Sequence, residues 1–536
     1  MQIQIAGADL VILLAYLGGI VALGCWAGLW RKKDGTSGEG TSYFLAGGSL
    51  KWPVIGLALF STNISTVHLV SLAEEGYKNG LAYGNFEWMA PFTLIVLSLF
   101  FAPFYIRSRV ATLPDFLERR YSKASRNWLS GLSIISAVFI HIGFSLYAGA
   151  VVLEGLFGIP LMTSIISIAV LTGIYTMVGG LMAVVLTESV QTIVLLIGAI
   201  VLTGVALVKV GGWGGLTETV DPHLFSVLRP KGDPSGLPWY SILLGYPIIG
   251  IWYWCTDQTI VQRVLGAKDE QHARLGPLFA GFLKILPVFI FVLPGLIAKA
   301  LIMQGKLPDV ERSSDIYSAM IAHLLPVGLK GLIAAALMAA LMSTVSGALN
   351  SAATLFSYDL YKQWQPDATE KRLITIGRMV TVAGMVLAIG VAPFLGRYPT
   401  IFQGINAAIS YISPPITSVF VFGVFWKGAS SFGSIATLIT GSALGFVVFG
   451  LDFFKEQTGW NVPFMMSGFY LFCICAVIMI TASLFKPEAL TEEKRGLIWN
   501  HPLDAIREPG LPGIRNYKLL AAVLFIVMLT LYAVFH

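Results

Sequence analysis

The chain has 536 residues, of which 56% are hydrophobic and only 12% are charged, and its mean hydropathy is +0.76. A soluble protein has about 25% charged residues, so this composition excludes an ordinary soluble domain and indicates a membrane protein. The net charge of +6 does not indicate nucleic-acid binding, because the basic residues occupy short loops between apolar runs.

The first apolar run, residues 8–30, has no basic residue before it and is followed directly by Arg31. A cleaved signal peptide has the opposite charge order, so we expect this run to remain as a spanning helix. The chain has four cysteines in or beside apolar runs, Cys25, Cys255, Cys473 and Cys475. Their placement predicts neither a disulfide framework nor a metal motif.

Fourteen apolar runs are long enough for membrane spans, each of which needs about 20 mainly apolar residues. In chain order they are residues 8–30, 52–75, 84–106, 128–157, 161–178, 183–208, 239–264, 275–302, 328–361, 374–396, 400–425, 429–450, 463–485 and 514–535. With this count the two densest basic clusters, at 107–126 and 486–518, fall on one side, as an excess of Lys and Arg in the cytoplasm requires. We therefore expect one multi-pass domain over 1–536 in the cell membrane, with both termini outside.

Long loops between these runs are few. Residues 209–238 and 303–327 form longer external stretches, the second with a short helix, and 114–121 reads as a cytoplasmic amphipathic helix.

Polar residues interrupt two of the apolar runs. The second run contains Ser-Thr-Asn-Ile-Ser-Thr at 61–66, and the seventh contains Gly-Tyr-Pro at 245–247, Gly250 and then Cys-Thr-Asp-Gln at 255–258. Hydroxyls in such clusters can simply bond back to carbonyls and pack helices closely. Breaks five spans apart favour a transport site between two inverted repeats, which we expect at 52–208 and 239–425, after the extra helix at 8–30 and before three helices in 429–536.

Ionisable residues inside the runs support such a site. Lys284 lies deep in its run, and His68, Glu87 and Glu188 lie in others. A charge at the bilayer centre costs about 2.5–3.5 kcal/mol or more, so these groups are either paired for structure or line a wet cavity. His68 alone could be a packing histidine and Glu87 a helix cap. Together, the mixed donors and acceptors favour a neutral polyhydroxyl ligand.

Five strings in the chain resemble the sodium/solute symporter family, and most nearly its sodium/glucose cotransporter branch. They are NIS with His68 at 63–68, FEW at 86–88, IWYWCTDQTIVQR at 251–263, GFLKILPVFI at 281–290 and LMSTVSGALNSAATLF at 341–356. The resemblance covers about residues 43–427. It implies an all-α, LeuT-like membrane fold with ten core helices in two inverted repeats, one helix before them and three after. It also implies a sodium-coupled sugar symporter and not an enzyme.

The resemblance further implies which residues bind the sugar. They are Asn63, His68, Glu87, Tyr253, Trp254, Lys284 and Asn406. Phe86 and Tyr253 are the implied outer and inner gates. Without the resemblance, Tyr253 and Trp254 would be read as interfacial or packing aromatics.

The implied sodium site consists of oxygen atoms only. Its ligands are the carbonyls of Ser61, Ile64 and Ala340 and the hydroxyls of Ser343 and Thr344. The alternative for the two hydroxyls is back-bonding within their own helix.

Some positions depart from the family pattern. Some members hold a second sodium ion, and the corresponding residues here are Glu188 and Ser346, but Gly347 has no hydroxyl, which favours one sodium ion per cycle. Gly250 stands where sugar transporters have a polar side chain, and Asn406 replaces a longer Gln. These changes leave the particular sugar open.

Other functions stay open at this point. One is sodium symport of another solute, such as sialic acid, an amino acid or a vitamin, and another is a sugar-gated channel or sensor. No nucleophile and base combination for an enzyme is apparent. The expected partners are a sugar, sodium and the lipid bilayer, without nucleic acid and without a required partner protein.

Overall fold

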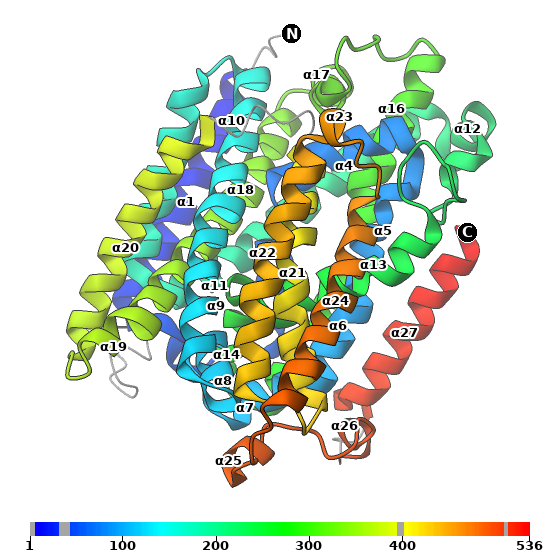
Figure 1. The fold of residues 1–536 in the computed structure, drawn as a ribbon. Coiled ribbons are helices and arrows are strands. Elements are labelled where there is room, and N and C mark those ends of the chain that lie inside the picture. Colours follow the sequence, from blue (N-terminus) through cyan, green and yellow to red (C-terminus); the bar gives the residue numbers. More distant parts are fainter. Residues whose placement is uncertain (1–5, 32–42, 394–400, 509–512) are drawn as a thin grey trace.

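The structure is a computed structural model that describes residues 6–31, 43–393, 401–508 and 513–536. Over these ranges it consists of helices packed side by side, with two isolated bridges in place of strands (Figure 1). Eleven of the described helices are long and apolar enough to cross a membrane, so the protein is a multi-pass membrane protein. The total of fourteen spans stays a prediction, and the boundary expected between the spans at 374–396 and 400–425 falls on residues outside the described ones.

The second predicted span is broken. Its halves are α3 (Trp52–Asn63) and α4 (Thr66–Asn79), and Ile64 and Ser65 between them have extended backbone. Ser65 and His68 form a reciprocal capping box that begins α4. This box supplies the first hydrogen bonds of a new helix, and α3 ends at Asn63, two residues before the Ser65 cap.

The seventh predicted span is broken in a similar way. α13 (Trp239–Ile251) widens into a π-type turn, η6 (Trp252–Thr256), and α14 (Gln258–Leu265) follows. Asp257 separates them, and its Oδ1 accepts the backbone N–H groups of Thr259 and Ile260 at 2.7 and 3.3 Å. Pro247 lies within α13, so the break falls at the Cys-Thr-Asp-Gln string and not at Gly-Tyr-Pro.

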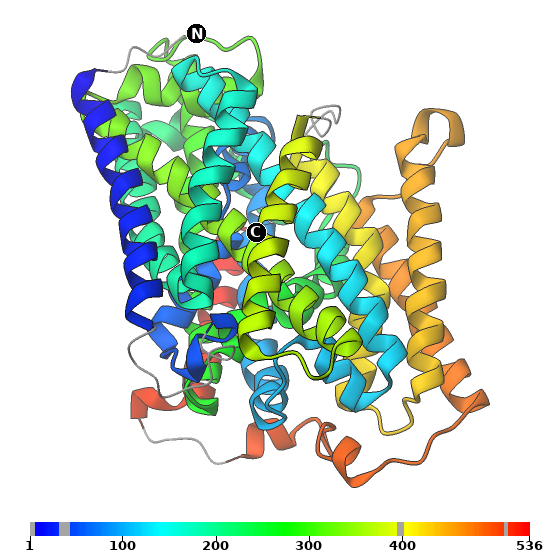
Figure 2. The same cartoon turned by 90° about the vertical axis from the view of Figure 1, so that its left-hand side faces the viewer.

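A rigid frame holds the two broken spans. α11 (Leu161–Val210) packs against α18 (Leu329–Leu355), and α1 (Gly7–Arg31) packs against both. At the opposite edge of the bundle stand α22 (Ser431–Phe453) and α24 (Phe464–Phe485) (Figure 2).

The remaining helices complete the bundle and its ends. They are α5 (Asn85–Trp88), α6 (Ala90–Val96), α7 (Ala102–Arg107), α8 (Leu113–Arg120), α9 (Lys123–Ser136), α10 (Phe144–Phe157), α12 (Gly212–Thr219), α15 (Glu270–Leu283), α16 (Leu293–Met303), α17 (Ile316–Leu324), α19 (Lys362–Trp364), α20 (Glu370–Val391), α21 (Ile401–Phe425), α23 (Lys455–Thr458), α25 (Glu492–Arg495), α26 (Asp504–Arg507) and α27 (Tyr517–Val534).

The two basic clusters lie at the same end of the bundle, where α8, α25 and α26 gather (Figure 1). An ion pair connects the two segments directly, because Arg107 of the first cluster lies 2.8 Å from Glu508 of the second. Arg107 also pairs with Glu270 at 2.8 Å. α8 is the predicted amphipathic helix at 114–121, and α17 is the short helix predicted within 303–327, at the other end.

The inner halves of the broken spans are side by side. The backbone N–H of Leu50, just before α3, donates to the Gly266 carbonyl at 3.0 Å, and the N–H of Lys268 donates to the Leu50 carbonyl at 2.9 Å. α3 also packs against α14 and α15. Because of these contacts, a shift of α14 would also move α3, which ends at the break of the second span.

Gly180 bends α11 between the spans expected at 161–178 and 183–208. Its φ of 61° and ψ of −155° are open only to glycine, and an added Cβ would lie 2.5 Å from the Tyr43 carbonyl oxygen. We expect Gly180→Ala to destabilise the fold by about 1–3 kcal/mol because it places a side chain in this backbone region. Thermal unfolding of purified protein measures the effect. Gly204→Ala in the same helix is the control, because its Cβ meets nothing within 4 Å, and equal melting temperatures for the two variants would contradict the prediction.

Candidate functional site

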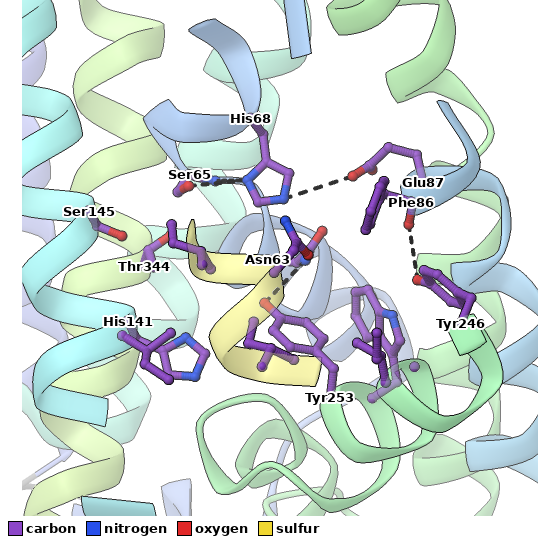
Figure 3. A pocket seen from close by; sticks show the side chains of 17 residues that line it. Asn63, Ser65, His68, Phe86, Glu87, His141, Ser145, Tyr246, Tyr253 and Thr344 are labelled. Atoms are coloured by element: carbon purple, nitrogen blue, oxygen red, sulfur yellow. Dashed lines mark hydrogen bonds and ion pairs between the residues drawn. The ribbon is translucent and has the colours of Figure 1, made fainter. Parts of the chain in front are cut away.

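A cavity of about 110 Å³ lies between the two broken spans. It is several times larger than the volume of about 10–15 Å³ that one water molecule needs. Its lining comprises Asn63, Ser65, His68, Phe86, Glu87, Ile140, His141, Ser145, Tyr246, Ile249, Gly250, Tyr253, Trp254, Thr344, Ile405, Asn406 and Ile409 (Figure 3). Six of the seven predicted sugar-binding residues are in this set, and Lys284 lies behind it.

Lys284 holds two of the lining residues in place. Its ammonium group is buried and donates to Asn63 Oδ1 and to Glu87 Oε2. The Nζ atom also lies 5.4 Å from the centre of the Trp254 ring and 5.8 Å from that of Phe60. A buried ammonium needs such partners because removing its charge from water is costly.

Asn63 connects the two broken spans. Its Oδ1 accepts from Lys284, and its Nδ2 donates to the Tyr253 hydroxyl at 3.1 Å (Figure 3). Asn63 is the last residue of α3, whereas Tyr253 belongs to the π-type turn η6. The hydrogen bond between Asn63 and Tyr253 therefore links the break of the second span to the break of the seventh.

The hydrogen bonds of His68 fix its tautomer. Its Nδ1 accepts the backbone N–H of Ser65 at 3.2 Å, so that nitrogen carries no proton. The proton is then on Nε2, which lies 3.9 Å from Glu87 Oε1. His68 thus presents an N–H and Glu87 a carboxylate oxygen towards the same part of the cavity (Figure 3).

Aromatic side chains form one wall. The Phe86 ring stacks on Tyr83 and on Phe464, with centroid distances of 5.9 and 6.4 Å. Its backbone carbonyl accepts the Tyr246 hydroxyl at 3.0 Å. At Gly250 an added Cβ would lie 2.7 Å from both Thr93 and Tyr246. A larger residue at this position would therefore clash with these two side chains unless they moved.

Backbone and hydroxyl oxygens gather where α3 meets α18. Ser343 Oγ donates to the carbonyls of Ser61 and Ala340 at 2.9 and 3.0 Å. Thr344 Oγ1 lies 3.2 Å from the carbonyls of Thr62 and Ala340. Four of the five predicted sodium ligands therefore converge, while Ile64 forms the adjacent break and Thr62 contributes a carbonyl that the sequence did not indicate.

These oxygens suit a hard cation. The carbonyls of Ser61 and Thr62 are at the C-terminus of α3, where they lose their helical partners and carry the negative end of the helix dipole. Two hydroxyl protons serve three carbonyls, so lone pairs outnumber protons. The Ser61 hydroxyl is also buried without a hydrogen-bond partner among the residues that the structure describes. Oxygen ligands in this surplus fit Na⁺ without a full negative charge from the protein.

The predicted second-sodium residues contact other groups. Both oxygens of the buried Glu188 bind the Arg263 guanidinium, and Oε1 also accepts from Thr62 at 2.8 Å. Ser346 Oγ donates to the Ser343 carbonyl at 3.0 Å. A Cβ at Gly347 would lie 2.4 Å from the guanidinium, so the glycine makes room for Arg263.

Some lining residues were not predicted. His141 and Ser145 lie on the segment from α9 to α10, and Tyr246 on α13. The rule that identified Lys284, an ionisable residue inside an apolar run, would also have identified His141. Tyr246 lies in the Gly-Tyr-Pro string at 245–247 but was not assigned a role. Ser145 had no comparable signal, because a single hydroxyl in an apolar helix is common.

The sequence model of the sodium:solute symporter family matches residues 43–441. The sodium/myo-inositol cotransporter 2 of Oryctolagus cuniculus is 35% identical over 493 residues, which cover 86% of this chain and 73% of that protein. The sodium/glucose cotransporter 1 of the same species is 32% identical over 533 residues, covering 90% and 79%.

Solved structures show the same fold. A substrate-bound, sodium-coupled sialic acid symporter superposes with a TM-score of 0.78 at 22% identity, covering 91% of this chain and all of that one. The nucleobase-cation-symport-1 family transporter MHP1 gives a TM-score of 0.57 at 13% identity, covering 85% and 98%. The predicted LeuT-like fold is thereby confirmed, as are the family and sodium as the coupling ion, and the relatives are cotransporters and not enzymes.

Arg263 neutralises a carboxylate in the centre of the bundle. We expect Arg263→Leu to lower stability by about 3–5 kcal/mol, because it leaves Glu188 buried without its ion-pair partner. The matched control is Arg312→Leu, since Arg312 pairs with Asp315 in an exposed loop, where such pairs contribute at most about 1 kcal/mol. The fraction of soluble monomer after heating separates the two variants, and equal losses would contradict the assigned role.

Proposed function

The chain belongs to the sodium:solute symporter family, and from this premise we propose that it imports a neutral sugar, of glucose or galactose type, together with sodium. The observation that carries the proposal is the buried pair of Glu87, which lines the cavity, and Lys284, which lies behind it. Its two charges compensate each other, and Asn63, which also accepts from Lys284, lines the cavity.

The charge of the cavity favours a neutral substrate. None of the described lining residues is Lys or Arg, and the ammonium of Lys284 is already paired with a carboxylate. A carboxylate substrate, such as sialic acid, would need an unpaired cation or a bare helix N-terminus. A cavity without net charge does not require a charged solute.

The lining also fits a ring of hydroxyl groups. Asn63 and Asn406 can donate and accept, the His68 Nε2–H donates, and the Glu87 carboxylate accepts. Sugar hydroxyls both donate and accept, so they match this mixed set. Tyr253 and Trp254 offer aromatic faces for the apolar C–H face of the ring, and Phe86 and Tyr253 are the proposed outer and inner gates.

Sodium and sugar meet at the break in the second span. The proposed sodium ligands are Ser61, Ile64, Ala340, Ser343 and Thr344. Asn63 and His68, on either side of the unwound Ile64 and Ser65, face the cavity, and Thr344 borders it too. Sodium bound to the carbonyls at the end of α3 would fix that turn, and thereby the two sugar-binding side chains beside it.

The proposed cycle is alternating access between the repeats at 52–208 and 239–425. Sodium and sugar bind from outside, the outer gate closes, and both leave to the cytoplasm. One ion gains about 2.3 kcal/mol per 100 mV of membrane potential, which is enough to accumulate the solute many-fold. The proposed orientation, in the cell membrane with both termini outside, follows from the loop charges.

The proposed stoichiometry is one sodium ion per sugar. Glu188, the acid at the second-sodium position, already has a full positive charge beside it in Arg263. Ser346 bonds within its own helix. Glu188 and Ser346 therefore offer a second sodium ion no uncompensated negative charge.

Uptake into proteoliposomes tests the proposed function. An inward sodium gradient should drive accumulation of labelled glucose, galactose or myo-inositol, and a competition panel of hexoses, pentoses and inositols identifies the preferred solute. The matched control replaces sodium by choline. Sodium currents without any uptake would indicate a channel or sensor, and competition by sialic acid alone would overturn the neutral-substrate proposal.

Lys284→Ala removes the ammonium that orients Asn63 and Glu87. We expect the sugar concentration for half-maximal uptake to rise by about tenfold, equivalent to about 1.4 kcal/mol, while the sodium dependence changes little. Lys299→Ala, in the same predicted span, is the control because Lys299 contacts Tyr77 away from the cavity. An unchanged apparent sugar affinity in Lys284→Ala would contradict the proposed site.

Thr344→Ala removes one oxygen from the proposed sodium site. The sodium concentration for half-maximal uptake should increase by about tenfold, because one of few ligands of a weakly bound ion is lost. Thr381→Ala is the control, because this threonine is buried and its hydroxyl donates back to the Gly377 carbonyl of its own helix. If sodium activation curves of the two variants coincide with wild type, Thr344 is not a ligand.

A further inference from the structure

His141 and Asp257 form a buried pair beneath the cavity. His141 Nε2 lies 3.3 Å from Asp257 Oδ2, and the two side chains are each 7% exposed. His141 lines the cavity, while Asp257 is the residue at which the seventh span breaks. The pair therefore joins two elements that the proposed cycle moves relative to each other.

Asp257 transmits the pairing to α14. While Oδ2 faces His141, Oδ1 accepts the first N–H groups of α14. His141 lies in the π-type turn η4 (Ala137–Gly143) between α9 and α10. Because the same carboxylate caps one helix and binds the other element, α14 cannot swing away from η4 without breaking this contact.

The pair lies on the side of the cavity that leads to the basic end of the bundle. The Cys255 carbonyl, two residues before Asp257, accepts the hydroxyl of Tyr105 in α7 at 2.7 Å. The Gln258 side chain accepts the N–H of Leu113 in α8 at 2.9 Å. α8 lies at the end that carries the basic clusters (Figure 1), which is the predicted cytoplasmic side.

The substrate site contacts the pair through Tyr253. The Tyr253 ring centre is 6.2 Å from that of His141, and the Tyr253 hydroxyl accepts from Asn63. Figure 3 shows His141 and Tyr253 together on one side of the cavity and His68 on the other. A solute that displaces Tyr253 would therefore change the surroundings of His141.

We propose that the His141–Asp257 pair is an inner latch that keeps the cavity closed to the cytoplasm until a solute is bound. The proposal rests on the proposed function. Separating two polar partners that are both buried is costly, so the pair opposes opening of the sodium-loaded but solute-free protein. Entry of a hydroxylated solute and its water gives His141, which lines the cavity, other partners. The latch thereby limits sodium leak, and His141 acts as a positioning residue.

Cysteine accessibility tests the latch without relying on uptake. Ser145→Cys places a thiol in the cavity lining, and a membrane-impermeant maleimide is added to inside-out vesicles in sodium without solute. Adding His141→Leu should speed labelling by about tenfold, since loss of the latch shifts the population towards the inward-open state. Asp257→Asn should do the same, because Asn still caps α14 but offers no charge to His141.

Rescue and control variants separate a latch from general loosening. His141→Lys again places a side-chain N–H donor beside Asp257 and should restore slow labelling. His223→Leu removes the His223–Asp233 pair, a 2.8 Å contact of the same type in the loop before α13, and should leave labelling unchanged. Labelling at the wild-type rate in both His141→Leu and Asp257→Asn, or equal rates in His141→Lys and His141→Leu, would overturn the latch. Failure of the proposed function would instead show as absent sodium-driven uptake in the unmodified protein.

Discussion

The two extended residues between α3 and α4 are the constraint on which the rest of the site depends. Because the chain leaves the helix at Ile64 and Ser65, the carbonyls of Ser61 and Thr62 have no helical N–H to accept. Unwound backbone at membrane depth must be satisfied by protein, water or ions. Here hydroxyls of α18 face those carbonyls, and Asn63 and His68 face the cavity on the next turn.

Two buried ion pairs surround this break and are each internally neutral. Lys284–Glu87 lies on the cavity side, and Arg263–Glu188 lies on the side of α11. Thr62 bonds to Glu188 and Asn63 bonds to Lys284, so consecutive residues of α3 attach to different pairs. Charges fixed in this way hold the unwound turn without offering an uncompensated charge to the solute. The proposed sodium ion then supplies the net charge that the membrane potential acts on.

The sequence indicated the membrane class and the broken spans because each has a local signature, whereas the candidate sugar-binding residues came largely from the resemblance to a family. Polar strings in apolar runs mark the breaks, and a lysine deep in a span must have a partner, which is Glu87. Partners distant in the chain could not be predicted from a single sequence: Arg263 for Glu188, Asp257 for His141 and Thr62 for Thr344. The break of the seventh span also fell at Asp257 and not at Pro247, because a proline near a helix centre can be tolerated while an aspartate cap begins a new helix.

Reciprocal binding measurements on the purified protein test most directly whether one unwound turn couples the two ligands. Affinity for the transported solute is measured with and without saturating sodium, and affinity for sodium with and without saturating solute. Coupling through the α3–α4 break predicts that each ligand tightens the other by the same factor, as linkage requires, and that Thr344→Ala reduces this factor. Solute binding of equal strength in sodium and in choline would contradict a shared site.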